Sequence, residues 1–215
     1  MALSHDTFET ARTVPVHRVT GGDDAPGGRL VVVLHGLMQR AGDLAAALAP
    51  LATPGQTLLV PEGLSRSLPR PGAPRAGASW STGDDAALDL ADNLRYLDAL
   101  LEHERALRQP SVLDLVGFSQ GGLMAARWVA ARAHPWRRVV LWASLVPADV
   151  APADLRSGLG EAELVVALGD RDPLVSAAVR ERALGRLDAL GRPWRLHRFD
   201  GGHAMAPGEL GRVLS

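Results

Sequence analysis

The sequence predicts an α/β fold with a mainly parallel central sheet and helices on both faces. Continuous apolar runs at residues 30–34, 57–60 and 164–169 have the composition of strands buried on both faces. Segments with helical spacing of apolar residues alternate with these runs, as expected for parallel strands joined by crossover helices. Short polar motifs follow several of the runs, and the loops after parallel strands meet at one edge of a sheet. We therefore expect a ligand site at the carboxyl edge.

Length and composition indicate a single domain covering residues 1–215. Of the 215 residues, 47% are hydrophobic and 22% are charged, values that exclude an intrinsically disordered protein. The formal net charge of -1 gives no basic field that could hold nucleic acid or an anionic membrane surface. We therefore expect neither nucleic acid nor a membrane as a partner, and the sequence leaves a homodimer open.

Two residue types are absent, and their absence excludes several chemistries. All 23 basic side chains other than histidine are arginine, so a Schiff-base lysine is excluded. The chain has no cysteine, which excludes disulfides, thiolate catalysis and cysteine-ligated zinc. We expect neither a cofactor nor a metal.

The N-terminus lacks the basic and apolar regions of a signal peptide. No apolar run reaches the ~18 residues of a membrane span. These two observations predict a cytoplasmic protein with no stable membrane association.

Strands and helices alternate along the chain. Strands are expected at 12–19, 30–34, 57–60, 112–116, 138–143, 164–169 and 194–199. Helices are expected at 43–51, 87–101, 123–133, 174–190 and 209–214. The first strand contains Pro15 and is expected at an edge of the sheet, because proline cannot donate to a central ladder. A loop rich in Pro and Gly spans 61–83, and residues 81–84 are expected to cap the following helix.

The segment 112–122 carries the strongest functional signal. The apolar run is followed directly by Gly117-Phe118-Ser119-Gln120-Gly121 and then by an expected helix. Between a strand and a helix, G-x-S-x-G predicts a nucleophile elbow, a sharp turn that exposes a strained serine. The alternative is a glycine-rich turn with an idle serine. Ser119 is the candidate nucleophile because its chemical partners occur elsewhere in the chain.

Histidine and aspartate motifs follow other expected strands. His35-Gly36 follows residues 30–34, Asp172 follows 164–169, and His203 follows 194–199. A serine hydroxyl needs a base beside it, and an imidazole titrates near neutrality, so it can take the proton and return it to the leaving group. A carboxylate fixes the imidazole tautomer and stabilises its cation.

Four motifs together resemble a known family: Leu34-His-Gly-Leu, Gly117-Phe-Ser-Gln-Gly-Gly, Gly169-Asp-Arg-Asp-Pro-Leu-Val and Gly201-Gly-His. In order and spacing they resemble the small carboxylesterase/phospholipase branch of the α/β-hydrolase fold, to which acyl-protein thioesterases belong. The resemblance runs from about residue 30 to the C-terminus. It implies an α/β-hydrolase fold, and the family order of nucleophile, acid and histidine is the order found here.

Carried over residue by residue, the resemblance makes Ser119 the nucleophile, Asp172 the acid and His203 the base. Asp170 competes as the acid, and Asp172 before Pro173 also has the pattern of a helix cap. Asp172 is preferred because it matches the family aspartate that has a valine three residues later. For His203 the alternative is a structural histidine in a turn.

An ester hydrolase also needs N–H donors for the oxyanion, and the backbone N–H groups of Leu37 and Gln120 are the candidates. The family usually has a second glycine where this chain has Met38, so either the loop has another shape or Met38 lines the acyl site. His35 is expected to brace this loop through hydrogen bonds. Trp80 resembles an aromatic position of related esterases and is expected either to wall the substrate pocket or to pack in the core.

The predicted function is a cofactor-free serine esterase that hydrolyses carboxylic esters or thioesters through an acyl-enzyme. About 20 residues separate the strands at 138–143 and 164–169, too few for a large lid. An open, shallow site of this kind favours short or medium acyl chains. The alternatives are an acyltransferase or perhydrolase with the same three residues, and a non-catalytic binding protein on this fold.

Overall fold

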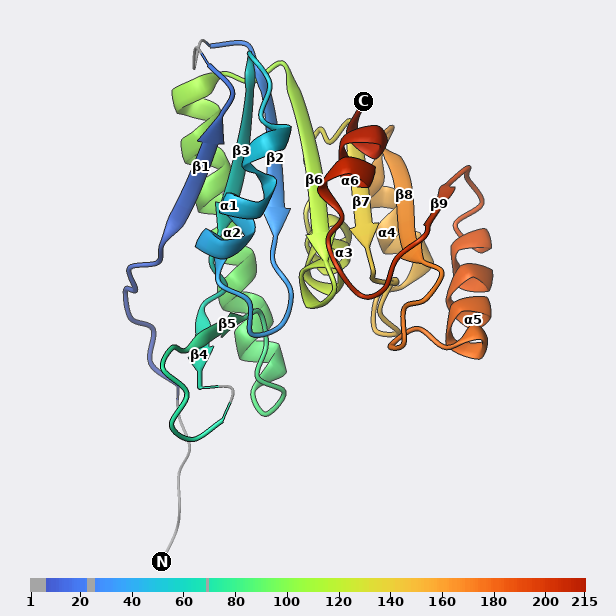
Figure 1. Ribbon diagram of the computed structural model, residues 1–215, viewed down its shortest axis with the longest axis horizontal. Helices are drawn as coiled ribbons and strands as arrows, with labels where there is room; N and C mark the ends of the chain where they lie inside the picture. Colours follow the sequence, from blue (N-terminus) through green and yellow to red (C-terminus); the bar gives the residue numbers. More distant parts are fainter. Residues whose placement is uncertain (1–6, 23–25, 69) are drawn as a thin grey trace, which may run out of the picture.

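The computed structural model describes residues 7–22, 26–68 and 70–215, which build one seven-stranded sheet with helices on both sides (Figure 1). The strand order is β1-β3-β2-β6-β7-β8-β9. The edge strand β1 (Val16–Thr20) pairs antiparallel with β3 (Gln56–Pro61), and all other neighbours in this sheet are parallel. The predicted fold class is confirmed, including the position of the first strand at an edge.

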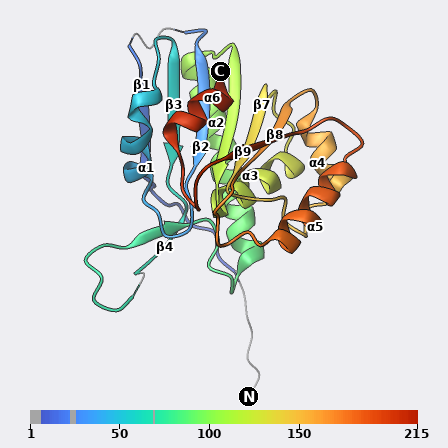
Figure 2. The same ribbon diagram turned by 45° about the vertical axis from the view of Figure 1, so that its right-hand side comes forward.

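The remaining strands of the sheet are β2 (Arg29–Leu34), β6 (Val112–Phe118), β7 (Arg138–Trp142), β8 (Glu163–Gly169) and β9 (Arg195–Phe199). Two short strands, β4 (Ser65–Ser67) and β5 (Gly77–Ser79), pair as a hairpin inside the segment expected to be a loop. Figure 2 shows this hairpin projecting from the body of the molecule. Strands of three residues are too short to produce a periodic pattern, so the sequence did not reveal them.

Among the described residues the α-helices are α1 (Ala41–Leu48), α2 (Ala86–Arg108), α3 (Gln120–Ala131), α4 (Pro152–Leu159), α5 (Ala177–Asp188) and α6 (Pro207–Leu214); the 3-10 helix η1 (Ala49–Leu51) follows α1. The short helix α4 was not predicted. It packs against α3 at Gly158, where a Cβ would lie 1.6 Å from the carbonyl oxygen of Val129. Since α4 is the only helix between β7 and β8, no large lid interrupts the described fold.

The cap predicted at residues 81–84 is wrong in detail. Helix α2 begins at Ala86, and its N-cap residue Asp85 makes no side-chain capping bond. Instead the carboxylate of Asp89, from the first turn, accepts hydrogen bonds from the N–H and the hydroxyl of Thr82 at 2.8 and 3.1 Å. The carboxylate of Asp89, inside the first turn, thus places negative charge at the N-terminus of α2 and stabilises it.

Alternate side chains of the strands pack into two separate cores. Leu30 and Val32 of β2 belong to one core, which also contains apolar side chains of α2, α3, α4 and α5. Val31 and Val33 belong to the other core, together with side chains of α1 and α6. Because side chains of a strand alternate between the two faces, continuous apolar runs were required to fill both cores.

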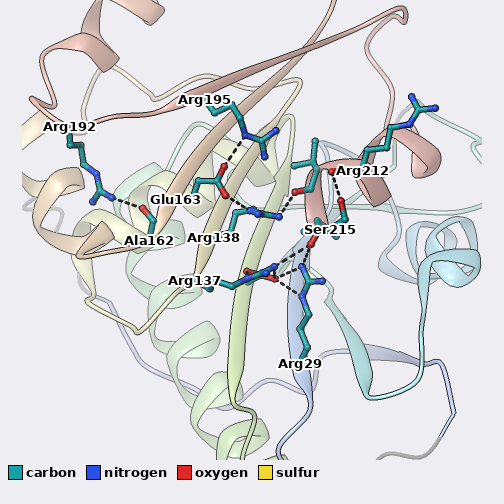
Figure 3. A network of polar contacts seen from close by, with 12 residues as sticks. Arg29, Arg137, Arg138, Ala162, Glu163, Arg192, Arg195, Arg212 and Ser215 are labelled. Carbon is teal, nitrogen blue, oxygen red and sulfur yellow. Dashed lines mark hydrogen bonds and ion pairs between the residues drawn. The ribbon is translucent and has the colours of Figure 1, made fainter.

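A network of arginine and carboxylate side chains ties the C-terminal helix to the amino ends of the strands (Figure 3). The fully buried Asp114 of β6 accepts from Arg29 at 2.6 Å and from Arg137 at 2.7 and 3.0 Å. Both arginines also donate to the carbonyl oxygen of Leu214, at 2.7 and 3.3 Å. Cations at the C-terminal end of α6 complement the helix dipole, so this network stabilises the edge of the sheet opposite the expected site.

Replacing Asp114 by asparagine should lower the free energy of unfolding by about 2 kcal/mol, because two arginines lose their buried anionic partner. Denaturant unfolding followed by circular dichroism measures the change. Asp92→Asn is the matched control, since Asp92 forms an exposed pair with Arg95 and such pairs contribute little. Equal losses in the free energy of unfolding for the two variants would show that the buried Asp114 network stabilises the fold no more than an exposed ion pair does.

The sheet is built outward in two directions from β2. The chain leaves β2, adds β3 on one side, and returns through α2 to place β6 on the other side. At such a reversal the loops after the two central strands diverge and leave a crevice at the carboxyl edge. The loop after β2 and the turn after β6 therefore meet where a site is expected.

None of the helices in the described part of the chain is long and apolar enough to cross a membrane.

Candidate active site

Ser119 occupies a strained turn between β6 and α3. Its φ of 53° and ψ of -117° lie outside the regions that residues with a side chain usually adopt. The turn is possible because glycines flank it: a Cβ on Gly117 would lie 2.4 Å from the carbonyl oxygen of Gly121, and a Cβ on Gly121 would lie 2.3 Å from that of Leu34. The surrounding packing therefore holds the serine in the conformation predicted for a nucleophile elbow.

A continuous hydrogen-bonded row joins Ser119, His203 and Asp172. The Nε2 atom of His203 lies 2.8 Å from the hydroxyl oxygen of Ser119, and its Nδ1 atom lies 2.8 Å from Oδ2 of Asp172. The carboxylate is fully buried, whereas 19% of the imidazole surface is exposed. The three residues come from the ends of β6, β8 and β9, so the carboxyl edge of the sheet brings them together as the sequence predicted.

The structure distinguishes Asp172 from the competing Asp170. The second oxygen of Asp172 accepts from the backbone N–H of Leu174 at 2.9 Å, which fixes the carboxylate toward the imidazole. Asp170 instead accepts from Arg198 at 2.7 Å and is partly exposed. The helix-cap interpretation of Asp172 is wrong, because α5 begins later and Ser176 accepts from the N–H of Val179 as its cap.

Neighbouring loops hold His203 in place. The N–H of Arg171 donates to the carbonyl oxygen of Gly201 at 2.9 Å, which joins the acid loop to the histidine loop. The indole of Trp142 donates to the carbonyl oxygen of Ala204 at 2.9 Å, and the ring of Phe118 lies 5.4 Å from the imidazole. The histidine is thus positioned by three strands rather than by its own turn alone.

The loop after β2 lies directly against the serine. A Cβ on Gly36 would lie 3.5 Å from Cβ of Ser119 and 2.9 Å from the ring of Phe118, so only glycine allows this approach. Met38 has a φ of 59°, in the left-handed region that glycine adopts readily. The loop therefore keeps a glycine-like backbone at the position where the family usually has glycine.

His35 braces this loop through hydrogen bonds, as expected. Its Nδ1 atom lies 2.8 Å from the carbonyl oxygen of Gly36, and its Nε2 atom accepts from the N–H of Gly63 at 2.9 Å. The ring is fully buried, and burial lowers its pKa despite the nearby Glu62. His35 is therefore neutral and suited to a structural role rather than to proton transfer.

The two candidate oxyanion donors, the backbone N–H groups of Leu37 and Gln120, belong to segments next to Ser119. Gln120 is the first residue of α3, and Leu37 follows Gly36 in the adjoining loop. Within the described residues, the backbone N–H groups of Leu37 and Gln120 donate to no protein acceptor. Both are thus available to a ligand, and the N-terminus of α3 favours negative charge there.

Trp80 is joined to three parts of the site. Its indole N–H donates to the carbonyl oxygen of His35 at 2.8 Å, and its backbone N–H donates to the side chain of Gln120 at 2.9 Å. The buried Asn93 donates to the carbonyl oxygen of Trp80 at 2.9 Å. Trp80 is almost fully buried, as the packing interpretation expected, and it also lines a cavity. The part of Asn93 was not anticipated, because an asparagine within a helix carries no motif.

Met38 does not belong to the lining of that cavity. Its sulfur accepts from the hydroxyls of Ser67 and Ser79, at 3.4 and 3.6 Å, and so it contacts the β4–β5 hairpin. Two leucines near these loops are exposed: Leu37, which follows Gly36, is 59% exposed, and Leu174, whose N–H bonds Asp172, is 68% exposed. Leu174 was not anticipated, because a single leucine after a proline is an ordinary surface residue in sequence.

Glu62 is a further group that sequence reasoning did not single out. It follows β3 directly, is fully buried, and its carboxylate lies 3.0 Å from Arg40 and 2.9 Å from Arg66. It also accepts from the N–H of Ala41, the first residue of α1, at 3.3 Å. The carboxylate therefore holds the far end of the loop that carries Leu37. Its position directly after a strand was the signal that could have revealed it.

Replacing Glu62 by glutamine should lower kcat for ester hydrolysis about tenfold with little change in KM, because the loop that carries Leu37 loses its charged anchor. Steady-state kinetics on a soluble ester measures both constants. Asp43→Asn removes an exposed partner of Arg75 and serves as the control. An unchanged kcat for the Glu62 variant would show that the carboxylate does not position the loop.

Fold and site together define a protein of the α/β-hydrolase class. The imidazole of His203 lies between the hydroxyl of Ser119 and the buried carboxylate of Asp172. It can therefore take the proton of the hydroxyl, whose oxygen then attacks a carbonyl carbon. Within the described residues, no group of three or more His, Asp or Glu side chains could hold a metal ion.

A family model described as Phospholipase/Carboxylesterase matches residues 16–215, and the chain belongs to this family. Among solved structures, the chain resembles esterase PE8 with 26% sequence identity over 94% of this chain and 96% of that one, at a TM-score of 0.68. No curated protein sequence matches the chain significantly.

Two further solved structures share the fold. Acyl-protein thioesterase 2 from Zea mays is 18% identical over 93% of this chain and 95% of its own, at a TM-score of 0.71. The carboxylesterase of Bacillus cereus is 18% identical over 93% of this chain and 91% of its own, at a TM-score of 0.64.

Proposed function

We propose that this protein is a serine esterase that cleaves carboxylic esters or thioesters through an acyl-enzyme. The observation that carries the proposal is the hydrogen-bonded row in which His203 lies 2.8 Å from both Ser119 and Asp172. Membership of the phospholipase/carboxylesterase family makes the protein a hydrolase, and this geometry supplies the means of hydrolysis.

In the first half-reaction, the hydroxyl oxygen of Ser119 attacks the carbonyl carbon while Nε2 of His203 takes the proton. The imidazolium that forms is stabilised by the buried carboxylate of Asp172, which also holds the proton of Nδ1. The imidazolium then gives its proton to the departing alkoxide or thiolate as the acyl-enzyme forms. Water repeats the sequence with the same base and releases the carboxylic acid.

Negative charge develops on the carbonyl oxygen in each tetrahedral intermediate. The backbone N–H groups of Leu37 and Gln120 are proposed to donate to this oxygen. Three features support the proposal. The two groups lack protein acceptors, Gln120 and Gly36 (the neighbours of Ser119 and Leu37 in the chain) lie next to the serine, and His35 and Trp80 fix these segments.

The open surroundings of the site support short or medium acyl chains as substrates. Leu37, which follows Gly36, and Leu174, whose N–H donates to Asp172, both have exposed apolar side chains to which part of an ester could bind. Between β7 and β8 the described chain forms only the short helix α4, with no large lid. Hydrolysis rates of p-nitrophenyl esters that peak at long chains would contradict the expected preference.

Labelling with a fluorophosphonate probe tests the function directly. The wild-type protein should react covalently, and mass spectrometry of the digested protein should locate the adduct on Ser119. An ester panel with and without added alcohol or hydrogen peroxide separates hydrolysis from acyl transfer and perhydrolysis. Failure of both labelling and hydrolysis across the panel would support a non-catalytic binding role instead.

A further inference from the structure

A cavity of about 460 Å³ runs along α3 from Gln120, the residue that follows Ser119, and the proposed chemical steps leave it unused. On one side it is lined by α3 residues that share a face of the helix: Gln120, Leu123, Met124 and Arg127. On the other side it is lined by the first turns of α2, including Ala87 and Leu90. Most of the lining is apolar, and its volume lies within the range of small-molecule sites.

The cavity extends from Gln120, the neighbour of Ser119 in the chain, to an ion pair. Gln120 directly follows Ser119, and Arg127 lies two turns further along α3, a distance of about 10 Å along the helix axis. At that end the guanidinium of Arg127 binds both carboxylate oxygens of Asp149, at 2.7 and 2.9 Å. At the near end the side-chain amide of Gln120 is bonded to Trp80 and Ser81.

The geometry of the proposed reaction decides which part of an ester points into the cavity. The leaving group must face His203, which returns the proton to it. The carbonyl oxygen must face the N–H groups of Leu37 and Gln120. The acyl substituent therefore extends away from His203, and the lining of the cavity includes no residue of the histidine loop.

We propose that this cavity binds the acyl chain of the ester and that the Arg127–Asp149 pair limits the length of that chain. The inference rests on the proposed function, because it takes Ser119 as the acylated residue. A methylene chain gains free energy along Leu123, Met124 and Leu90. At the far end it meets two charged groups that bind each other, and a longer chain would have to separate them or remove them from water.

Filling the cavity tests the first part of the proposal. Ala87→Phe places a ring where Ala87 lines the cavity, and Ala99→Phe adds the same ring to an exposed position of α2 outside it. The p-nitrophenyl esters of acetate, butyrate, octanoate and palmitate report chain-length preference. Ala87→Phe should lower the kcat/KM ratio of octanoate to acetate about tenfold or more, and Ala99→Phe should leave it unchanged.

Removing the ion pair tests the second part. Arg127→Met replaces the guanidinium by an apolar group of similar reach and should shift the preferred ester toward longer chains. Arg132→Met is the matched control, because Arg132 is an exposed residue paired with Asp98 at 2.9 Å outside the cavity. An unchanged optimum in Arg127→Met would overturn the length limit.

The other outcomes separate this inference from the proposed function. If wild-type protein hydrolyses esters and labels at Ser119 but Ala87→Phe keeps the wild-type chain-length profile, the cavity does not bind the acyl chain. The same conclusion follows if Ala87→Phe selectively affects acetate esters of bulky alcohols, which would place the leaving group there. Absence of both labelling and hydrolysis in the wild type would refute the proposed function itself.

Discussion

Replacement of Ser119 by alanine should lower kcat for ester hydrolysis by about 10⁶-fold and abolish covalent labelling by fluorophosphonate. The alanine variant retains the imidazole and the carboxylate but has no oxygen that could attack the carbonyl. Initial rates on p-nitrophenyl acetate and in-gel fluorescence of the labelled protein measure the two effects. Because the elbow backbone is held by Gly117, Gly121 and the surrounding packing, the variant should keep the wild-type circular dichroism spectrum.

Ser111→Ala is the matched control, since Ser111 lies just before β6 at the opposite edge of the sheet and donates to the carbonyl oxygen of Gly27. This control should label and hydrolyse like the wild type. Persistent labelling of the Ser119 variant at another residue would refute the nucleophile assignment.

Replacement of Asp172 by asparagine should lower kcat by about 10⁴-fold. The amide is nearly isosteric with the carboxylate, but it is uncharged and its NH₂ group cannot accept the Nδ1 proton. His203 would then lose the stabilisation of its cation and favour the tautomer with a proton on Nε2, which cannot receive the serine proton. Single-turnover kinetics with a fast-leaving ester measures the acylation step.

Asp170→Asn tests the competing acid in the same assay. Asp170 pairs with Arg198 at the surface rather than with His203, so its variant should retain nearly full activity. A larger loss in the Asp170 variant than in the Asp172 variant would reverse the assignment of the acid.

The strands and the polar motifs that follow them could be predicted because their signals are local. A strand buried on both faces must be apolar at every position, as residues 30–34 are, and this pattern needs no knowledge of neighbours. The elbow around Ser119 is equally local, since its strain requires glycines at fixed offsets within five residues. Each of these features is specified by consecutive residues.

The groups that hold the site in place could not be predicted in this way. Glu62 and Asn93 carry no motif and act through contacts with other segments of the chain, at Arg40 and Trp80. Leu174 acts through its backbone N–H on the nearby Asp172, a bond that depends on the conformation of the loop. The β4–β5 hairpin was also not predicted, because strands of three residues show no periodicity. Helix α4 was not predicted because only Leu155 and Leu159 mark its buried face with large apolar side chains. Their conformations depend on packing against elements already in place.

The sequence by itself determined the fold class, the order of the motifs and the chemical types that meet at the carboxyl edge. Only the tertiary structure decided that Asp172 rather than Asp170 contacts His203, that Met38 adopts a glycine-like backbone against the hairpin, and that a cavity runs beside α3. The physical reason is that hydrophobic pattern and backbone strain are encoded by neighbours in the chain. Hydrogen-bond partners and cavity walls are decided by distances between residues that only the folded sheet brings together.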